Sequence, residues 1–221
     1  MQLKPQDFVV AFKLVAWGGE RWTYARMAHE LGLSASEAHA AVKRGLQAGL
    51  LENNPVWPAP ASTGGVLEEP AALYRVRARP RRPSRERVAR NVANEASPLM
   101  DDNPARVHRA NLTEFAVHGA RFAFPAQRLP NSPGVPTGRS CPEAARWLPK
   151  GEGAWVWPHP QGPWQGQGIE PLHPGVPFAA MQDVRLHEML ALFDALRVGE
   201  PGERQAAGQR LQSLLGVGSV E

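Results

Sequence analysis

The chain has 221 residues, a length that fits one large domain or two small ones. Hydrophobic residues make up 43% and charged residues 21% of the chain, which is ordinary globular usage and excludes wholesale disorder. The chain contains 22 Pro and 21 Gly, so we expect long irregular segments. Because the Gly residues do not recur at every third position, a collagen-like chain is excluded.

Charge is distributed unevenly along the chain. The formal net charge is +4. Residues 1–90 hold 14 Lys and Arg against 8 Asp and Glu, a balance of +6, whereas residues 91–221 hold 11 against 13, a balance of −2. A basic half beside an acidic half indicates a polyanionic partner for the first half.

Cysteine usage and hydropathy indicate the cellular setting. Cys141 is the only cysteine, so an intrachain disulfide is excluded, and we expect no cysteine-based zinc site, no other metal and no cofactor. The first residues lack the apolar core of a secretory signal peptide. The longest apolar stretch, Phe8–Trp17, is interrupted by Lys13 and is too short to span a bilayer. We therefore expect a soluble cytoplasmic protein with no membrane partner.

The first fifty residues predict three helices. Pro5 suits the first position of a helix whose apolar residues recur at helical spacing. Thr23 is a good N-cap for a second helix, which Gly32 ends. The third helix begins at a capping box, in which Ser34 caps the N–H of Glu37 while Glu37 reaches back.

The two faces of the third helix differ in chemistry. Its apolar inner face is formed by Ala38, Val42 and Leu46. Its outer face carries the hydrogen-bonding side chains of Ser36, His39, Lys43, Arg44 and Gln47. Ser36, His39, Lys43 and Gln47 lie near one line along the helix, and Arg44 lies one residue further round the helix axis. Two short helices joined by a tight turn form a helix-turn-helix pattern, and such an outer face can present its side chains to base edges in the DNA major groove.

Residues Trp22–Leu51 resemble the helix-turn-helix of winged-helix bacterial transcriptional regulators, the broad class that includes MarR-like repressors. Ala28 matches the small residue where the two helices cross, and Gly32 matches the turn. Val42 and Leu46 match the buried positions of the recognition helix, and residues 48–51 match its exit into the first wing strand. The resemblance implies a double-stranded DNA partner. The alternative is a small helical bundle whose polar outer face is merely solvated or docks another protein.

A basic segment follows the three helices. Arg75, Arg77 and Arg79 alternate with apolar residues, as on a strand with one apolar face, and Arg81 and Arg82 continue the charge. Side chains at this spacing can follow a DNA backbone, so we expect these arginines to contact phosphates. We also expect a phosphate contact from Thr23.

The alternative for the basic segment is a solvated linker. Residues 52–69 are longer and richer in Pro than a typical wing hairpin. Either the wing is long, or the arginine strand is not its return strand.

The second half predicts helices around a loop-rich lobe. We expect a helix over Arg109–Phe122 and short strands over 154–157 and 164–169. Residues 125–177 contain 4 Trp, which we expect to form the core of this lobe; a cage for a ligand is the alternative.

Two further helices are expected over Asp183–Val198 and Glu203–Leu215. The first has a wide apolar stripe, which we expect to pack on its own lobe and also on a partner, forming a homodimer. The stripe consists of Leu186, Met189, Leu190, Phe193 and Leu196.

Known enzyme motifs are absent from the sequence. His187 and Glu188 lack the second His of a zincin helix, and there is no nucleophile elbow or phosphate-binding Gly-Lys-Ser/Thr loop. We therefore expect no enzymatic activity. The segments Asn111–Pro125 and Glu170–Pro177 resemble uncharacterised bacterial winged-helix regulators, some of which are similar to antitoxins encoded beside a toxin.

Together these features predict an α+β fold with three regions. These are an N-terminal winged helix-turn-helix over residues 1–80, a basic and then irregular linker over 81–108, and a C-terminal α+β lobe over 109–221. The predicted function is sequence-specific DNA binding by a transcriptional regulator, a repressor acting as a homodimer. The alternative is a protein–protein interaction module, such as an antitoxin that neutralises a toxin and also regulates its own gene.

Overall fold

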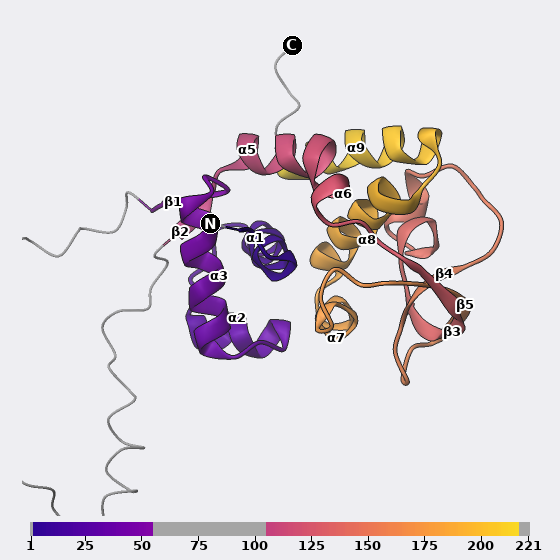
Figure 1. Ribbon diagram of the computed structural model, residues 1–221, viewed down its shortest axis with the longest axis horizontal. Helices are drawn as coiled ribbons and strands as arrows, with labels where there is room; N and C mark the ends of the chain where they lie inside the picture. The colour runs from indigo at the N-terminus through magenta and orange to yellow at the C-terminus, as the bar shows by residue number, and fades with distance from the viewer. Residues whose placement is uncertain (1, 55–104, 217–221) are drawn as a thin grey trace, which may run out of the picture.

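The computed structural model describes residues 2–54 and 105–216, and in these ranges the fold is mixed α+β, as predicted (Figure 1). The first range contains α1 (Pro5–Trp17), α2 (Tyr24–Leu31), α3 (Ala35–Gln47) and β1 (Leu51–Asn53). The second range begins with β2 (Ala105–Val107), α5 (Arg109–Glu114), the π-helical turn η1 (Phe115–Gly119), α6 (Ala120–Ala123) and β3 (Arg128–Pro136). It continues with the 3₁₀ turns η2 (Gly138–Ser140) and η3 (Ala144–Arg146), then β4 (Trp155–Pro158), β5 (Trp164–Ile169), α7 (Val176–Gln182), α8 (Val184–Val198) and α9 (Pro201–Leu215).

The predicted helix caps in the N-terminal region are confirmed. The hydroxyl of Thr23 accepts from the backbone N–H of Arg26 at 3.1 Å. Ser34 and Glu37 form the expected capping box: the Ser34 hydroxyl accepts from the N–H of Glu37 at 3.2 Å, and the Glu37 carboxylate accepts from the N–H of Ser34 at 2.8 Å. Gly32 ends α2 at a φ of 64°, a left-handed conformation that favours glycine.

A two-stranded antiparallel sheet follows α3. β1 pairs with β2, with Leu51 opposite Val107 and Asn53 opposite Ala105. The expected irregular linker over 81–108 therefore ends in a strand, because β2 supplies backbone hydrogen bonds to β1. The residues expected to form a basic strand, 75–79, lie outside the described ranges.

Helix α1 lies at the centre of one continuous core. Every residue from Asp7 to Trp17 is buried, and α1 contacts α2, α3, β2 and α8. Its Phe8 ring lies 5.1 Å from the ring of Phe193 on α8 and 5.3 Å from that of Phe115. The apolar cluster thus runs from the first three helices into the second half without interruption, so the two predicted domains share a core.

The second half contains a small closed barrel. β3 pairs antiparallel with both β4 and β5, and β4 pairs parallel with β5. Trp155 and Trp157 on β4 are 2% and 1% exposed, so these two belong to the core, whereas Trp147 and Trp164 are 51% and 43% exposed. The carboxylate of Asp194 on α8 accepts from the indole N–H of Trp157 and from the hydroxyl of Thr137, which joins the barrel to α8.

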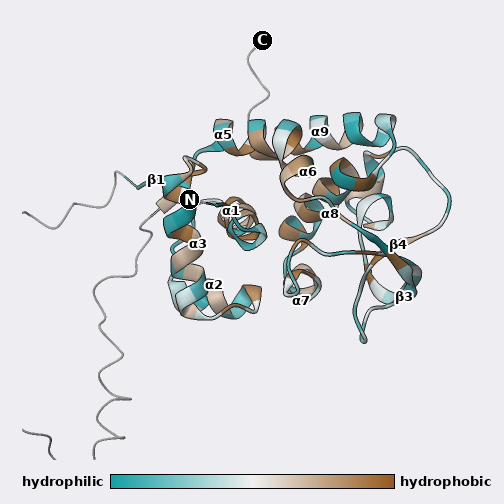
Figure 2. Cartoon of the chain, viewed as in Figure 1, coloured by the Kyte–Doolittle hydropathy of each residue, from teal (hydrophilic) through white to brown (hydrophobic). Residues whose placement is uncertain are grey.

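The predicted dimer stripe on α8 is wrong as an interface, because the chain buries it against itself. η2 and the helices α1, α7 and α9 all pack on α8, and Figure 2 shows the hydrophobic residues concentrated along it. Each of the five predicted residues has an exposed fraction of 3% or less: Leu186, Met189, Leu190, Phe193 and Leu196. No helix in the described ranges is long and apolar enough to cross a membrane.

A buried ammonium group connects three helices within this core. Lys13 of α1 is 2% exposed, and its Nζ lies 2.6 Å from a carboxylate oxygen of Glu30 on α2. The same Nζ lies 2.7 Å from the carboxylate of Asp183, the N-cap of α8. Removing an ammonium from water is costly unless carboxylates compensate its charge, so Lys13 requires α2 and α8 to sit where they do.

We expect the double variant Glu30→Gln/Asp183→Asn to lose on the order of 3 kcal/mol of unfolding free energy, because it leaves Lys13 buried without a counter-charge. Both changes keep the shape of the side chain, and Asn still caps α8. Adding Lys13→Met should restore most of the loss, and urea unfolding measures both effects. Adding Lys4→Met instead, at an exposed lysine of the same region, should restore nothing. Equal rescue by the two methionines would contradict the role of Lys13.

Candidate nucleic-acid interface

Helix α3 lies at the edge of the molecule, on the side away from the β3–β4–β5 barrel (Figure 1). Four of the residues predicted to read bases are exposed on it: Ser36, His39, Lys43 and Gln47. Their spacings of three, four and four residues place them in one row along the helix. At 1.5 Å per residue the row is about 16 Å long, and a helix of about 10–12 Å diameter fits a major groove about 12 Å wide.

The opposite face of α3 is held in the core. Ala38 and Ala41 are fully buried, and Val42 is 1% exposed, while Leu46 is half-buried. Gly45 lies against Leu51: a Cβ built on it would be 2.8 Å from the Leu51 side chain. The small residues bring α3 close to its neighbours and leave the polar row facing outward.

Arg44 is not presented to DNA, which corrects its predicted role. Its Nε and Nη2 donate to the two carboxylate oxygens of Asp7 on α1, at 2.8 and 2.6 Å. The Asp7 side chain is fully buried, and that of Arg44 is 17% exposed. Hydrogen bonding to Asp7 raises the pKa of Arg44. Arg44 lies one residue further round the helix than the polar row and faces α1. Its role is therefore to position α3.

Two of the predicted DNA-contacting residues also make contacts within the chain. The His39 ring packs edge-on against Tyr24 of α2, with ring centroids 5.0 Å apart. The Thr23 oxygen accepts the capping hydrogen bond of α2, which leaves its O–H able to donate to a phosphate. The other predicted phosphate contacts, Arg75, Arg77, Arg79, Arg81 and Arg82, lie outside the described residues.

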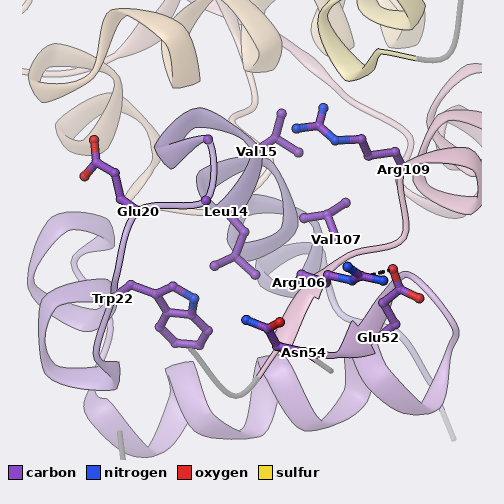
Figure 3. Close-up of a pocket in the computed structure, with 12 residues that line it drawn as sticks. Leu14, Val15, Glu20, Trp22, Glu52, Asn54, Arg106, Val107 and Arg109 are labelled. Atoms are coloured by element: carbon purple, nitrogen blue, oxygen red, sulfur yellow. Dashed lines mark hydrogen bonds and ion pairs between the residues drawn. The ribbon is translucent and has the colours of Figure 1, made fainter. Parts of the chain in front are cut away.

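A cleft of about 450 Å³ lies between the end of α1, the approach to α2 and the β1–β2 sheet (Figure 3). Its apolar wall includes Leu14 and Trp22, and its polar rim includes an ion pair of 2.9 Å between Arg106 and Glu52. Arg109 also lines it and donates to the backbone carbonyl of Leu215. Among the described residues that line this cleft, the charged side chains are those of Glu20, Glu52, Arg106 and Arg109.

Sequence reasoning missed the positioning residues of this region. Asp7 and Lys13 were visible as single charges in an otherwise apolar helix, a signal that each needs a buried partner. In the described part of the chain, one group of metal-ligating side chains also comes together: Cys141, Glu143 and His187. This group lies in the second half of the chain, away from α3.

Comparisons with protein-family models, with curated proteins and with solved structures give no match to this chain.

The contact between Asp7 and Arg44 can be measured by a double-mutant cycle with Asp7→Asn and Arg44→Gln. We expect a coupling energy of about 2 kcal/mol in urea unfolding, since the two side chains are paired at two points and largely buried. A parallel cycle of Asp7→Asn with Lys43→Gln is the control and should give a coupling near zero, because Lys43 faces away from α1. Equal couplings in the two cycles would contradict the assigned position of Arg44.

Because of the capping box of α3, the stability of the protein should depend on pH in the acidic range. Hydrogen bonds from the backbone and hydroxyl of Ser34 lower the pKa of Glu37 below its ordinary value of 4.5. A carboxylate with a lowered pKa contributes stability above its unfolded-state pKa and loses it as the pH falls through the folded-state pKa. At neutral pH the Tm of the wild type should therefore be higher than the Tm of Glu37→Gln. This difference in Tm should vanish on acidification below pH 4.5. In a Ser34→Ala background the pH dependence of this difference should be much smaller.

Proposed function

We propose that the protein is a sequence-specific, double-stranded DNA-binding transcriptional regulator, a repressor in which α3 enters the major groove. The observation that carries the proposal is the outward row of Ser36, His39, Lys43 and Gln47 on a helix whose other face is buried. In this proposal α2 and α3 form the helix-turn-helix, and β1 and β2 form the base of a wing.

The residues of the row suit the chemistry of base edges. Lys43 can donate to O6 and N7 of guanine, and Gln47 can pair with N6 and N7 of adenine through two hydrogen bonds. The Ser36 hydroxyl can donate or accept, and His39, whose ring packs edge-on against Tyr24, can donate or accept through its ring nitrogens. A row in which each side chain differs from the next favours sequence discrimination over binding to phosphates alone.

The anchoring of α3 supports the same function. Arg44 and Asp7 hold the helix on α1, so the row is ordered before DNA arrives and binding costs less conformational entropy. Backbone contacts in this proposal come from Thr23 and from Arg75, Arg77, Arg79, Arg81 and Arg82. In this proposal the protein binds a two-fold symmetric DNA site as a homodimer, and the dimer interface lies outside the buried stripe of α8.

A second candidate function is binding of a protein partner, as an antitoxin would do. It is favoured by large apolar side chains near α7: Phe178, Met181 and Val184 are 42%, 45% and 61% exposed. Exposed apolar residues that gather in one region are typical of protein interfaces. The two functions are compatible, because a regulator can bind DNA and a partner through different surfaces.

The proposal is tested with a DNA site selected by the full chain from a random duplex library. Lys43→Ala should lose about 1–3 kcal/mol of binding free energy on this site and relax preference at one base pair. Lys150→Ala is the matched control, an exposed lysine of the second half, and should bind like wild type. The protein-binding function would be favoured if the full chain enriches no sequence from the library. It would also be favoured if Lys43→Ala and Lys150→Ala bind DNA alike.

Arginines of the basic segment should have a different signature on the same DNA. Changing Arg75, Arg77 or Arg79 to Ala should weaken binding to selected and scrambled duplexes equally. It should also reduce the slope of log K against log salt by about one for each phosphate that the protein no longer neutralises. A change in sequence preference on replacing these arginines would contradict their role in binding phosphates.

A further inference from the structure

Three side chains of the types that bind transition metals meet between the loop after β3 and the first turn of α8. Cys141 follows η2, Glu143 precedes η3, and His187 lies on α8. Each offers one ligand atom, and these atoms all lie within 4.8 Å of one another. Within residues 2–54 and 105–216 this is the group of His, Cys and carboxylate side chains whose geometry could hold an ion.

The distances are close to those of a tetrahedral zinc site. The Cys141 Sγ lies 3.7 Å from a carboxylate oxygen of Glu143. Zn–S bonds of about 2.3 Å and Zn–O or Zn–N bonds of about 2.0–2.1 Å place neighbouring ligand atoms about 3.3–3.6 Å apart. The sulfur and oxygen are thus already near this separation. The remaining distances, at most 4.8 Å, need closing by no more than about 1.5 Å.

The surroundings of His187 match those of a metal-binding histidine. Its Nε2 lies 2.7 Å from the backbone carbonyl of Pro136, a contact in which Nε2–H donates. In a neutral imidazole that donates through Nε2, the lone pair is on Nδ1. Metal-binding histidines almost always donate their other ring N–H to a carbonyl or carboxylate, which fixes the ring and its tautomer.

We propose that Cys141, Glu143 and His187 form a binding site for a zinc ion. A thiolate with an imidazole selects Zn²⁺ over Mg²⁺ and Ca²⁺, which prefer oxygen ligands. One thiolate and one carboxylate neutralise the two charges of the ion, so the occupied site carries no net charge in a largely buried position. The fourth position of the tetrahedron is left for water.

Binding of the ion replaces the proton of the thiol. Without metal, the thiol of the fully buried Cys141 donates to the Glu143 carboxylate, and burial raises the pKa of Cys141 to about 12. When Zn²⁺ binds, an S–Zn bond forms and the S–H bond breaks, and the proton leaves to the buffer. The ion would fasten the 138–146 loop to α8, beside the point where the Asp194 carboxylate holds the barrel.

The test uses the full chain without an affinity tag, stripped with a chelator and titrated with Co²⁺ and then Zn²⁺. We expect one equivalent of Co²⁺ to give a thiolate-to-cobalt charge-transfer band and the visible bands of a tetrahedral ion, and Zn²⁺ to remove both. Cys141→Ser should abolish the charge-transfer band. Glu143→Gln should weaken Zn²⁺ binding by at least about tenfold, the loss found even for outer-shell changes.

Two further measurements separate loss of a ligand from loss of the fold. Glu143 is only half-buried, so the metal-free Glu143→Gln variant should unfold at the same Tm as the metal-free wild type. Added Zn²⁺ should raise the Tm of the wild type far more than the Tm of the variant. His173→Gln, at a histidine outside the group, is the matched control and should bind like wild type. Absence of the charge-transfer band in wild type, its persistence in Cys141→Ser, or equal weakening in His173→Gln would overturn the site.

Discussion

The charge of Lys13 must be neutralised inside the core, and the arrangement of the helices depends on this requirement. Its carboxylate partners come from α2 and from the N-cap of α8, positions separated by about 150 residues of sequence. A second buried charge on the same helix, that of Asp7, holds Arg44 of α3. Helix α1 therefore carries one buried acid and one buried base, and each specifies where another helix sits. Each buried ion pair constrains the helices beyond their apolar contacts, because a displaced partner would leave a charge buried without a counter-charge.

This arrangement links the second half of the chain to the orientation of α3. Asp183 begins α8, Lys13 contacts Asp183 and Glu30, and Glu30 lies in the last turn of α2. A displacement of α8 would therefore disturb the ion pairs of Lys13 with Asp183 and Glu30, and a resulting shift of α1 would disturb its ion pair with Arg44 of α3. The barrel and the proposed metal site both contact α8, so both contribute to the packing that orients α3 and its outward row.

Local signals in the sequence predicted much of the fold, and long-range contacts account for what was missed. The caps at Thr23 and Ser34 depend on residues three positions away, so they could be read directly. β3 was missed because its three prolines argue against a strand, although the barrel accommodates them. The apolar stripe of α8 gave the helix correctly but not its neighbours, since periodicity shows that a face is buried and not what covers it. Arg44 was assigned to DNA because Asp7 is 37 residues away. Cys141 and His187 escaped a search based on paired cysteines for the same reason.

The register of β1 and β2 has a consequence for how this protein can vary. Asn53 and Ala105 face each other across the sheet, so the chain leaves and returns at the same place. The intervening residues are in effect inserted between two adjacent points of a finished scaffold. The entropy of closing a loop rises only with the logarithm of its length, by about 0.6 kcal/mol for each doubling. The pairing of β1 with β2 therefore fixes the distance between the two ends of this connection, and it constrains the length of the connection only weakly.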